Sequence, residues 1–130
     1  MRGLDANVLV RYVTQDDKRQ SALATKVIEQ EEQLLVIQPV TLCELVWVLS
    51  FSYGFGRDAI ASVLERILRT AQFEIVDKDT ACHALASFVS GKGDFADYYI
   101  GEANSHAGAE TTLTFDKSLR RHPSFELLVA

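Results

Sequence analysis

The sequence predicts an α/β fold built on a parallel sheet. Short apolar runs of strand length alternate along the chain with longer segments whose apolar residues recur every three or four positions. Strands separated by helices pair in parallel, and such sheets are covered on both faces. The chain has 130 residues, with two prolines and no internal repeat, so we predict one domain over residues 1–130.

The first half of the chain is predicted to form two strands and four helices. Steps of three and four between apolar residues mark each helix, and the second strand is a continuous apolar run closed by Pro39. In chain order we expect a strand at Gly3–Leu4, helices over 8–13 and Gln20–Glu31, a strand at Leu34–Ile37, and helices from about 42 to 54 and over 60–68.

The second half is predicted to form three strands and three helices. Its strands are rich in apolar and β-branched residues, and a glycine-rich turn at 91–93 separates two of the helices. We expect a strand at Phe73–Val76, helices over 81–89 and from about Asp94 to Ala107, a strand at Thr111–Thr114, a short helix starting near Asp116, and a strand at Phe125–Val129.

The composition is typical of a globular protein, with 48% hydrophobic and 24% charged residues. No apolar run approaches the roughly 20 residues of a membrane span, and no secretory signal is visible. We interpret Cys43 and Cys82 as buried, reduced thiols, which fits a cytoplasmic protein. Neither has a second cysteine or a histidine at ligand spacing, so no zinc site is expected around them.

The net charge of −5 argues at first against a nucleic-acid partner, because most polynucleotide binders carry a basic surface. This objection weakens if several acids gather in one pocket and divalent cations neutralise them.

Acidic residues recur where a strand leads into a helix. Asp5 follows the first strand, and Asp116 follows the fourth. Glu44 is expected in the first turn of the helix that comes after the Leu34–Ile37 strand. Asp94 and Asp97 are expected at the start of the helix that ends near Ala107. Functional groups of open parallel sheets collect at the carboxyl ends of the strands, so these carboxylates are expected to converge. Clustered carboxylates need a cation, and their oxygen atoms suit Mg²⁺ or Mn²⁺. Such an ion can promote phosphodiester hydrolysis.

The alternative is that each acid merely caps a helix. Glu44 completes a capping-box pattern, Asp94 and Asp116 stand at helix starts, and Asp97 favours the helix dipole. Capping does not account for Asp5, which lies in an apolar stretch at the start of the predicted sheet.

Four motifs follow one another in a fixed order: Gly3–Tyr12, a Thr-x-x-Glu-Leu helix start at Glu44, Asp94–Ile100 and Thr114–Lys117. Together they resemble the PIN-domain nucleases, and among them the VapC-type toxins of toxin–antitoxin pairs. The resemblance implies a three-layer α/β/α sandwich on a five-stranded parallel sheet. It also implies a metal-dependent ribonuclease, with RNA as substrate, a cognate antitoxin as partner, and a homodimer or higher oligomer.

The resemblance implies a catalytic quartet: Asp5, Glu44, Asp97 and Asp116. Asp5 and Asp97 are expected as direct ligands of Mg²⁺ or Mn²⁺, with Glu44 and Asp116 binding water or a second ion and Asp94 as a supporting ligand.

Neighbouring positions match the family in part. Asn7 and Thr114 match residues that orient the carboxylates or water. Ala6 stands where a hydroxyl residue is frequent, and Arg2 lies in a strand that is usually apolar. These departures concern fine positioning and the burial of the first strand.

Substrate contacts are expected just beyond Asp116. The candidates there are basic side chains able to hold phosphates, namely Lys117, Arg120, Arg121 and His122. Arg11, Lys92 and Arg57, elsewhere in the chain, are additional candidates. A solvated charged turn is the equal alternative. Tyr98 and Tyr99 can stack on bases but more readily pack in the core. We interpret the histidines at 83, 106 and 122 as structural or surface residues.

Three questions stay open at this point. The aromatic stretch from Trp47 to Phe55 fits either core packing or an interface with an antitoxin or a second copy. A phospho-acceptor receiver module also clusters acids at strand ends, but Asp5 lacks the adjacent acid that it would need. A metal-free scaffold of the same fold would bind RNA or protein without cleaving it.

Overall fold

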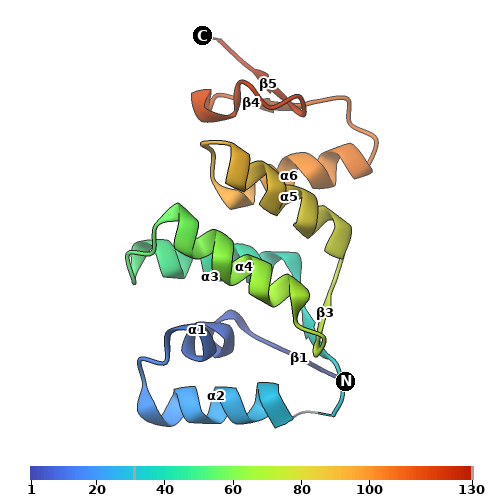
Figure 1. The fold of residues 1–130 in the computed structure, drawn as a ribbon. Coiled ribbons are helices and arrows are strands. Elements are labelled where there is room, and N and C mark those ends of the chain that lie inside the picture. Colours follow the sequence, from blue (N-terminus) through green and yellow to red (C-terminus); the bar gives the residue numbers. More distant parts are fainter. Residues whose placement is uncertain (31, 130) are drawn as a thin grey trace. The chain divides into compact units, whose positions relative to one another are not determined.

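The computed structural model describes residues 1–30 and 32–129, and it divides into two compact units, Met1–Asp77 and Lys78–Ala130 (Figure 1). Five strands and six α-helices are found in these described ranges, in the predicted order. The α/β fold is therefore confirmed. Glu31, the expected last residue of the second helix, lies outside the described residues. None of the described helices has the length and apolar character needed to cross a membrane.

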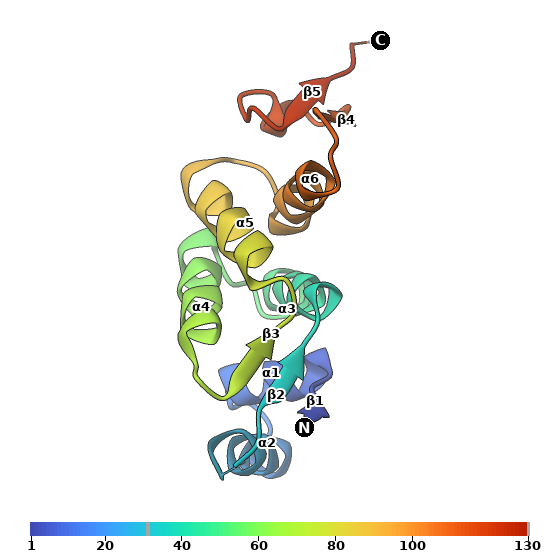
Figure 2. The same ribbon diagram turned by 90° about the vertical axis from the view of Figure 1, so that its right-hand side faces the viewer.

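The first unit contains a parallel sheet in the order β1-β2-β3, with β1 at Arg2–Gly3, β2 at Leu35–Ile37 and β3 at Phe73–Ile75 (Figure 2). Gly3 pairs with Val36, and the Leu4 N–H donates to the Val36 carbonyl at 2.9 Å. Because β1 and β2 run parallel, the residues that follow them lie at the same edge of this sheet.

Four helices belong to the first unit: α1 Ala6–Thr14, α2 Lys18–Gln30, α3 Pro39–Phe51 and α4 Arg57–Arg69. Helix α1 packs against α2 and α3, and α3 against α4. The predicted apolar face of α4 is confirmed, since Ile60, Val63, Leu64, Ile67 and Leu68 are all buried. Burial of such a stripe supplies most of the stability of a short helix.

Helix α3 begins earlier than predicted, and this changes the position of Glu44. Pro39 occupies the first turn and Gln38 is the N-cap, because the fixed φ of proline suits the first helical position. Glu44 therefore lies beyond the first turn. The predicted first-turn position and the capping box of Glu44 are wrong.

The second unit contains helices α5 Lys78–Ser90 and α6 Phe95–His106, which pack against each other. Strands β4 Thr112–Thr114 and β5 Phe125–Leu127 pair in parallel, and a 3₁₀ turn, η1 Lys117–Leu119, lies between them. The five predicted strands are thus present as a three-stranded sheet in the first unit and a two-stranded sheet in the second. Every pair is parallel.

The core of the second unit is aromatic. Tyr98 and Tyr99 are 2% and 5% exposed, so core packing is confirmed and the base-stacking interpretation is wrong. Tyr98 Oη accepts a hydrogen bond from the Gly93 N–H at 2.9 Å. A Cβ on Gly101 would lie 2.6 Å from Phe125 Cζ, so only glycine lets the ring of β5 sit this close to α6.

The two cysteines are less buried than predicted. Cys82 is exposed, because the buried stripe of α5 contains Ala81 and Ala84 and the residue after Ala81 turns away from it. Cys43 is half-buried, and this burial raises the pKa of its thiol to about 11.

Candidate acidic metal site

Asp5 stands two residues after β1 and is the N-cap of α1. Its Oδ1 accepts a hydrogen bond from the Ala6 N–H at 2.7 Å. Capping therefore does apply to Asp5, which corrects the sequence-based argument that capping leaves this residue unexplained. The carboxylate remains exposed at the edge of the three-stranded sheet.

Glu44 and Asn7 line one pocket of about 740 Å³ in the first unit, together with Ala6 and Arg11. Both side chains are exposed. The residues on either side of Asp5 in the chain, Leu4 and Ala6, thus line the same pocket as Glu44. That Asp5 and Glu44 share one site stays a prediction.

Arg11 is engaged by a partner on its own unit. Its Nη1 lies 2.9 Å from both carboxylate oxygens of Asp16. Asp16 also accepts hydrogen bonds from Tyr53 Oη at 2.5 Å and from Thr14 Oγ1 at 2.8 Å. These contacts, those of Tyr53 and Thr14 first, hold the pKa of Asp16 far below its usual range. The role of Arg11 as a phosphate contact stays a prediction.

We expect Asp16→Asn to lower the midpoint of thermal unfolding at pH 7. A carboxyl with a lowered folded-state pKa stabilises the native state above its ordinary pKa of 3.8. That stabilisation is lost as the pH falls below this value toward the folded-state pKa. The difference between variant and wild type should thus hold from pH 7 to about pH 4 and narrow below it. Glu74→Gln, at an exposed acid on β3, is the control. A difference that stays constant through the acid range would contradict the assignment.

In the second unit, three acids lie close enough for their charges to interact. Asp94 is the N-cap of α6 but makes no side-chain capping bond, and Asp97 lies in the first turn of α6. Partial burial raises the pKa of Asp97, and the charges of Asp94 and Asp116 raise it further. Asp94 and Asp116 therefore lie near enough to Asp97 for their charges to act on its carboxyl group. That the three acids share one metal ion stays a prediction.

Asp116 is held in place by its neighbours. It stands two residues after β4 and caps η1, as the capping alternative predicted. Its Oδ1 accepts from the Ser118 N–H at 2.8 Å and from Ser118 Oγ at 2.7 Å, and both bonds lower the pKa of Asp116. Thr114 Oγ1 accepts from the Asp116 N–H at 3.0 Å. Sequence reasoning missed Ser118, although a serine two residues after an aspartate is a common turn signal.

The basic residues after Asp116 divide into two kinds. Lys117, Arg120 and Arg121 are exposed, which is compatible with either phosphate binding or a solvated turn. His122 is half-buried and bonded within the chain, which favours its interpretation as a structural residue over the phosphate contact that was also predicted. Its Nδ1 accepts from the Ser124 N–H at 3.1 Å, and its Nε2 lies 2.9 Å from Ser87 Oγ.

The quartet is therefore distributed over the two units, with Asp5 and Glu44 on the first and Asp97 and Asp116 on the second. Its assembly into one site stays a prediction. Among the described residues, the group of side chains placed closely enough to share a metal ion is a different one, His83, Glu102 and His106. Sequence reasoning missed this group, although Glu102 and His106 share one face of a helix.

The sequence is similar to one family of known proteins. The family model described as PIN domain matches residues 4–124, a range that spans both units and includes every acid of the candidate site. A search among curated proteins found no match.

Proposed function

Because this chain belongs to the PIN domain family, whose members are generally nucleases, we propose that it is an Mg²⁺- or Mn²⁺-dependent endoribonuclease. We further propose that it is the VapC-type toxin of a type II toxin–antitoxin module. The observation that carries the proposal is the raised pKa of Asp97, a half-buried residue of the second unit.

Burial disfavours the ionised form of the Asp97 carboxyl group, and the two neighbouring acids disfavour it further. Asp116 is at the same time held ionised by Ser118. A concentration of negative charge of this kind is relieved by a divalent cation. The donors are all carboxylate oxygens, and hard oxygen ligands are those that Mg²⁺ and Mn²⁺ prefer. The residues present therefore fit the metal that the family usually binds.

The proposed site has the acids that the family resemblance implies. Asp5 and Asp97 would hold the ion, with Asp94 as a supporting ligand, while Glu44 and Asp116 would bind water or a second ion. When bound, a divalent cation supplies Lewis acidity, which activates water toward phosphorus and neutralises the charge that develops on the phosphate.

The surrounding side chains have supporting roles in this proposal. Thr114 and Ser118 fix the position of Asp116 through its backbone N–H and its Oδ1. Lys117, Arg120 and Arg121, exposed in the turn after Asp116, would bind the phosphates of the RNA. The net charge of −5 then does not oppose RNA binding, because bound cations neutralise part of the acidic excess.

Two protein partners belong to the proposal, a cognate antitoxin and a second copy of the chain. Helix α3 carries an apolar patch that is exposed within its unit, formed by Val40, Trp47 and Phe51 at 71%, 59% and 74% exposure. The rings of Trp47 and Phe51 contact each other, with centroids 5.1 Å apart. An exposed patch of large apolar side chains supports an interface on this helix.

The test is RNA cleavage by the purified chain after removal of any bound partner protein. Transfer, ribosomal and messenger RNA are each incubated with Mg²⁺, with Mn²⁺ and with EDTA. We expect cleavage of at least one RNA in the presence of either ion, no cleavage in EDTA, and recovery when Mg²⁺ is added back. A chain that binds RNA without cleaving it, or that cleaves equally in EDTA, would overturn the proposal.

A further inference from the structure

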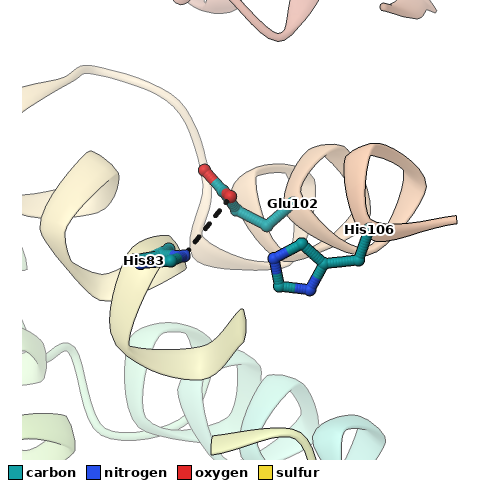
Figure 3. Close-up of side chains that lie close together, drawn as sticks. All are labelled: His83, Glu102 and His106. Atoms are coloured by element: carbon teal, nitrogen blue, oxygen red, sulfur yellow. Dashed lines mark ion pairs between the residues drawn. The ribbon is translucent and has the colours of Figure 1, made fainter. Parts of the chain in front are cut away.

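A second group of three side chains able to bind a metal lies on the packed helices α5 and α6 of the second unit. It shares no residue with Asp94, Asp97 and Asp116, which we call the acidic trio. His83 comes from α5, and Glu102 and His106 come from α6 (Figure 3). His83 Nδ1 lies 3.8 Å from Glu102 Oε2, and one candidate ligand atom from each residue lies within 4.8 Å of the other two. We call this group the His–Glu–His cluster.

Helix geometry accounts for the cluster. Glu102 and His106 are one helical turn apart, so both side chains rise from the same face of α6. His83 follows the buried stripe of α5 and turns toward the neighbouring helix. Figure 3 shows all three side chains directed into the space between α5 and α6.

The side chains of the cluster are oriented by residues around them. His106 Nδ1 is hydrogen-bonded to Oγ1 of the buried Thr80 at 2.7 Å. Its other ring nitrogen, Nε2, points toward His83 and Glu102 (Figure 3). Glu102 Oε1 faces His122 Nε2 at 4.0 Å, while Oε2 faces His83. In metal-ligating histidines, one ring nitrogen typically makes a hydrogen bond that fixes the ring, while the other nitrogen binds the metal.

We propose that His83, Glu102 and His106 bind one transition-metal ion of the Zn²⁺ class. Two imidazoles and one carboxylate form a common ligand set for Zn²⁺, and imidazole is a poor ligand for Mg²⁺. Ligand atoms around tetrahedral Zn²⁺ stand about 3.3 Å apart, from bond lengths of about 2.0–2.2 Å. Since the candidate ligand atoms lie within 4.8 Å of one another, the cluster needs a contraction of up to about 1.5 Å to reach this spacing. Rotation of the His83 side chain, which is 61% exposed, can contribute to it.

Such an ion would tie α5 to α6. The helix that carries Glu102 and His106 also carries Asp97 in its first turn, so the ion would stabilise the element on which this acid stands. Metal binding by the His–Glu–His cluster does not depend on nuclease activity, so it can be tested on the folded chain without RNA.

The test is Zn²⁺ binding by calorimetry, repeated with Co²⁺ by visible absorption, in the presence of excess Mg²⁺ to occupy carboxylate sites. We expect one Zn²⁺ per chain. The variants His83→Gln, Glu102→Gln and His106→Gln should each weaken binding by about 10-fold or more, and Thr80→Val, which removes only the orienting hydroxyl, by about 10-fold. Asp79→Asn, at an exposed acid on the same helix, is the matched control and should bind as the wild type does.

Two results would overturn the proposal. One is Zn²⁺ affinity that is unchanged in all three ligand variants. The other is loss of Zn²⁺ binding in Asp97→Asn but not in His106→Gln, which would place the ion among the acids. Circular dichroism checks that each variant is folded. Should a variant unfold, nuclear magnetic resonance of the wild type with Co²⁺ decides, because paramagnetic shifts must appear at the rings of His83 and His106.

Discussion

Replacing Asp97 by asparagine is expected to lower the rate of RNA cleavage by roughly 10²-fold or more. Loss of an outer partner of a metal ligand alone typically costs about 10- to 100-fold, and Asp97 is proposed as a direct ligand. The charges of both Asp94 and Asp116 act on its carboxyl group. Asparagine keeps the shape of the side chain but removes the charge that would hold the proposed cation.

Single-turnover cleavage at saturating Mg²⁺ measures this effect without a contribution from product release. Glu110→Gln removes an exposed acid of the same unit and should leave the rate within about twofold of the wild type, since surface charges away from a site contribute little. Equal losses in both variants would mean that general negative charge, not the acidic trio, supports cleavage. Full activity in Asp97→Asn would remove Asp97 from the site.

The elements of the fold could be predicted because their signals are local. The apolar face of α4 is a repeat within a single helix, and each strand is a short run of apolar or β-branched residues. The predictions fail where a single position departs from the three- and four-residue apolar repeat of a helix. Pro39 starts α3 early and so displaces Glu44 from the first turn, and a step of one position around α5 exposes Cys82.

The candidate site could be predicted only in part, because its members are distant in sequence. The rule that functional groups follow parallel strands selected Asp5 and Asp116, and both do stand two residues after a parallel strand, β1 and β4. Their role in a common site stays a prediction. The rule could not reveal that Ser118 anchors Asp116, or that Asp5 is also a helix cap. The His–Glu–His cluster was missed because its ligands come from two helices, and their packing has no spacing signature in the sequence.

In the absence of metal, Asp97→Asn is expected to be more stable than the wild type at pH 7. The raised pKa of Asp97 means that its ionised form is disfavoured in the folded chain. This penalty is present above the folded-state pKa, fades as the pH falls through it, and is gone below the ordinary value of 3.8. Solvent screens part of the charge, so the gain should be less than about 1 kcal/mol in the free energy of unfolding.

Addition of Mg²⁺ should reverse this order of stability. An ion that binds only the native state stabilises it by about 2.7 kcal/mol at a concentration of about 100 times its Kd. The wild type should gain this amount, whereas Asp97→Asn should gain little because it lacks a proposed ligand. Urea unfolding in EDTA and in Mg²⁺ measures both orders, with Glu110→Gln expected to follow the wild type. If the variant were less stable than the wild type in EDTA, then the carboxyl group of Asp97 would be a structural contact and not a site prepared for a cation. The order of stability should invert on metal binding because burial and the neighbouring charges disfavour ionised Asp97 without a cation, and a bound cation would relieve both effects.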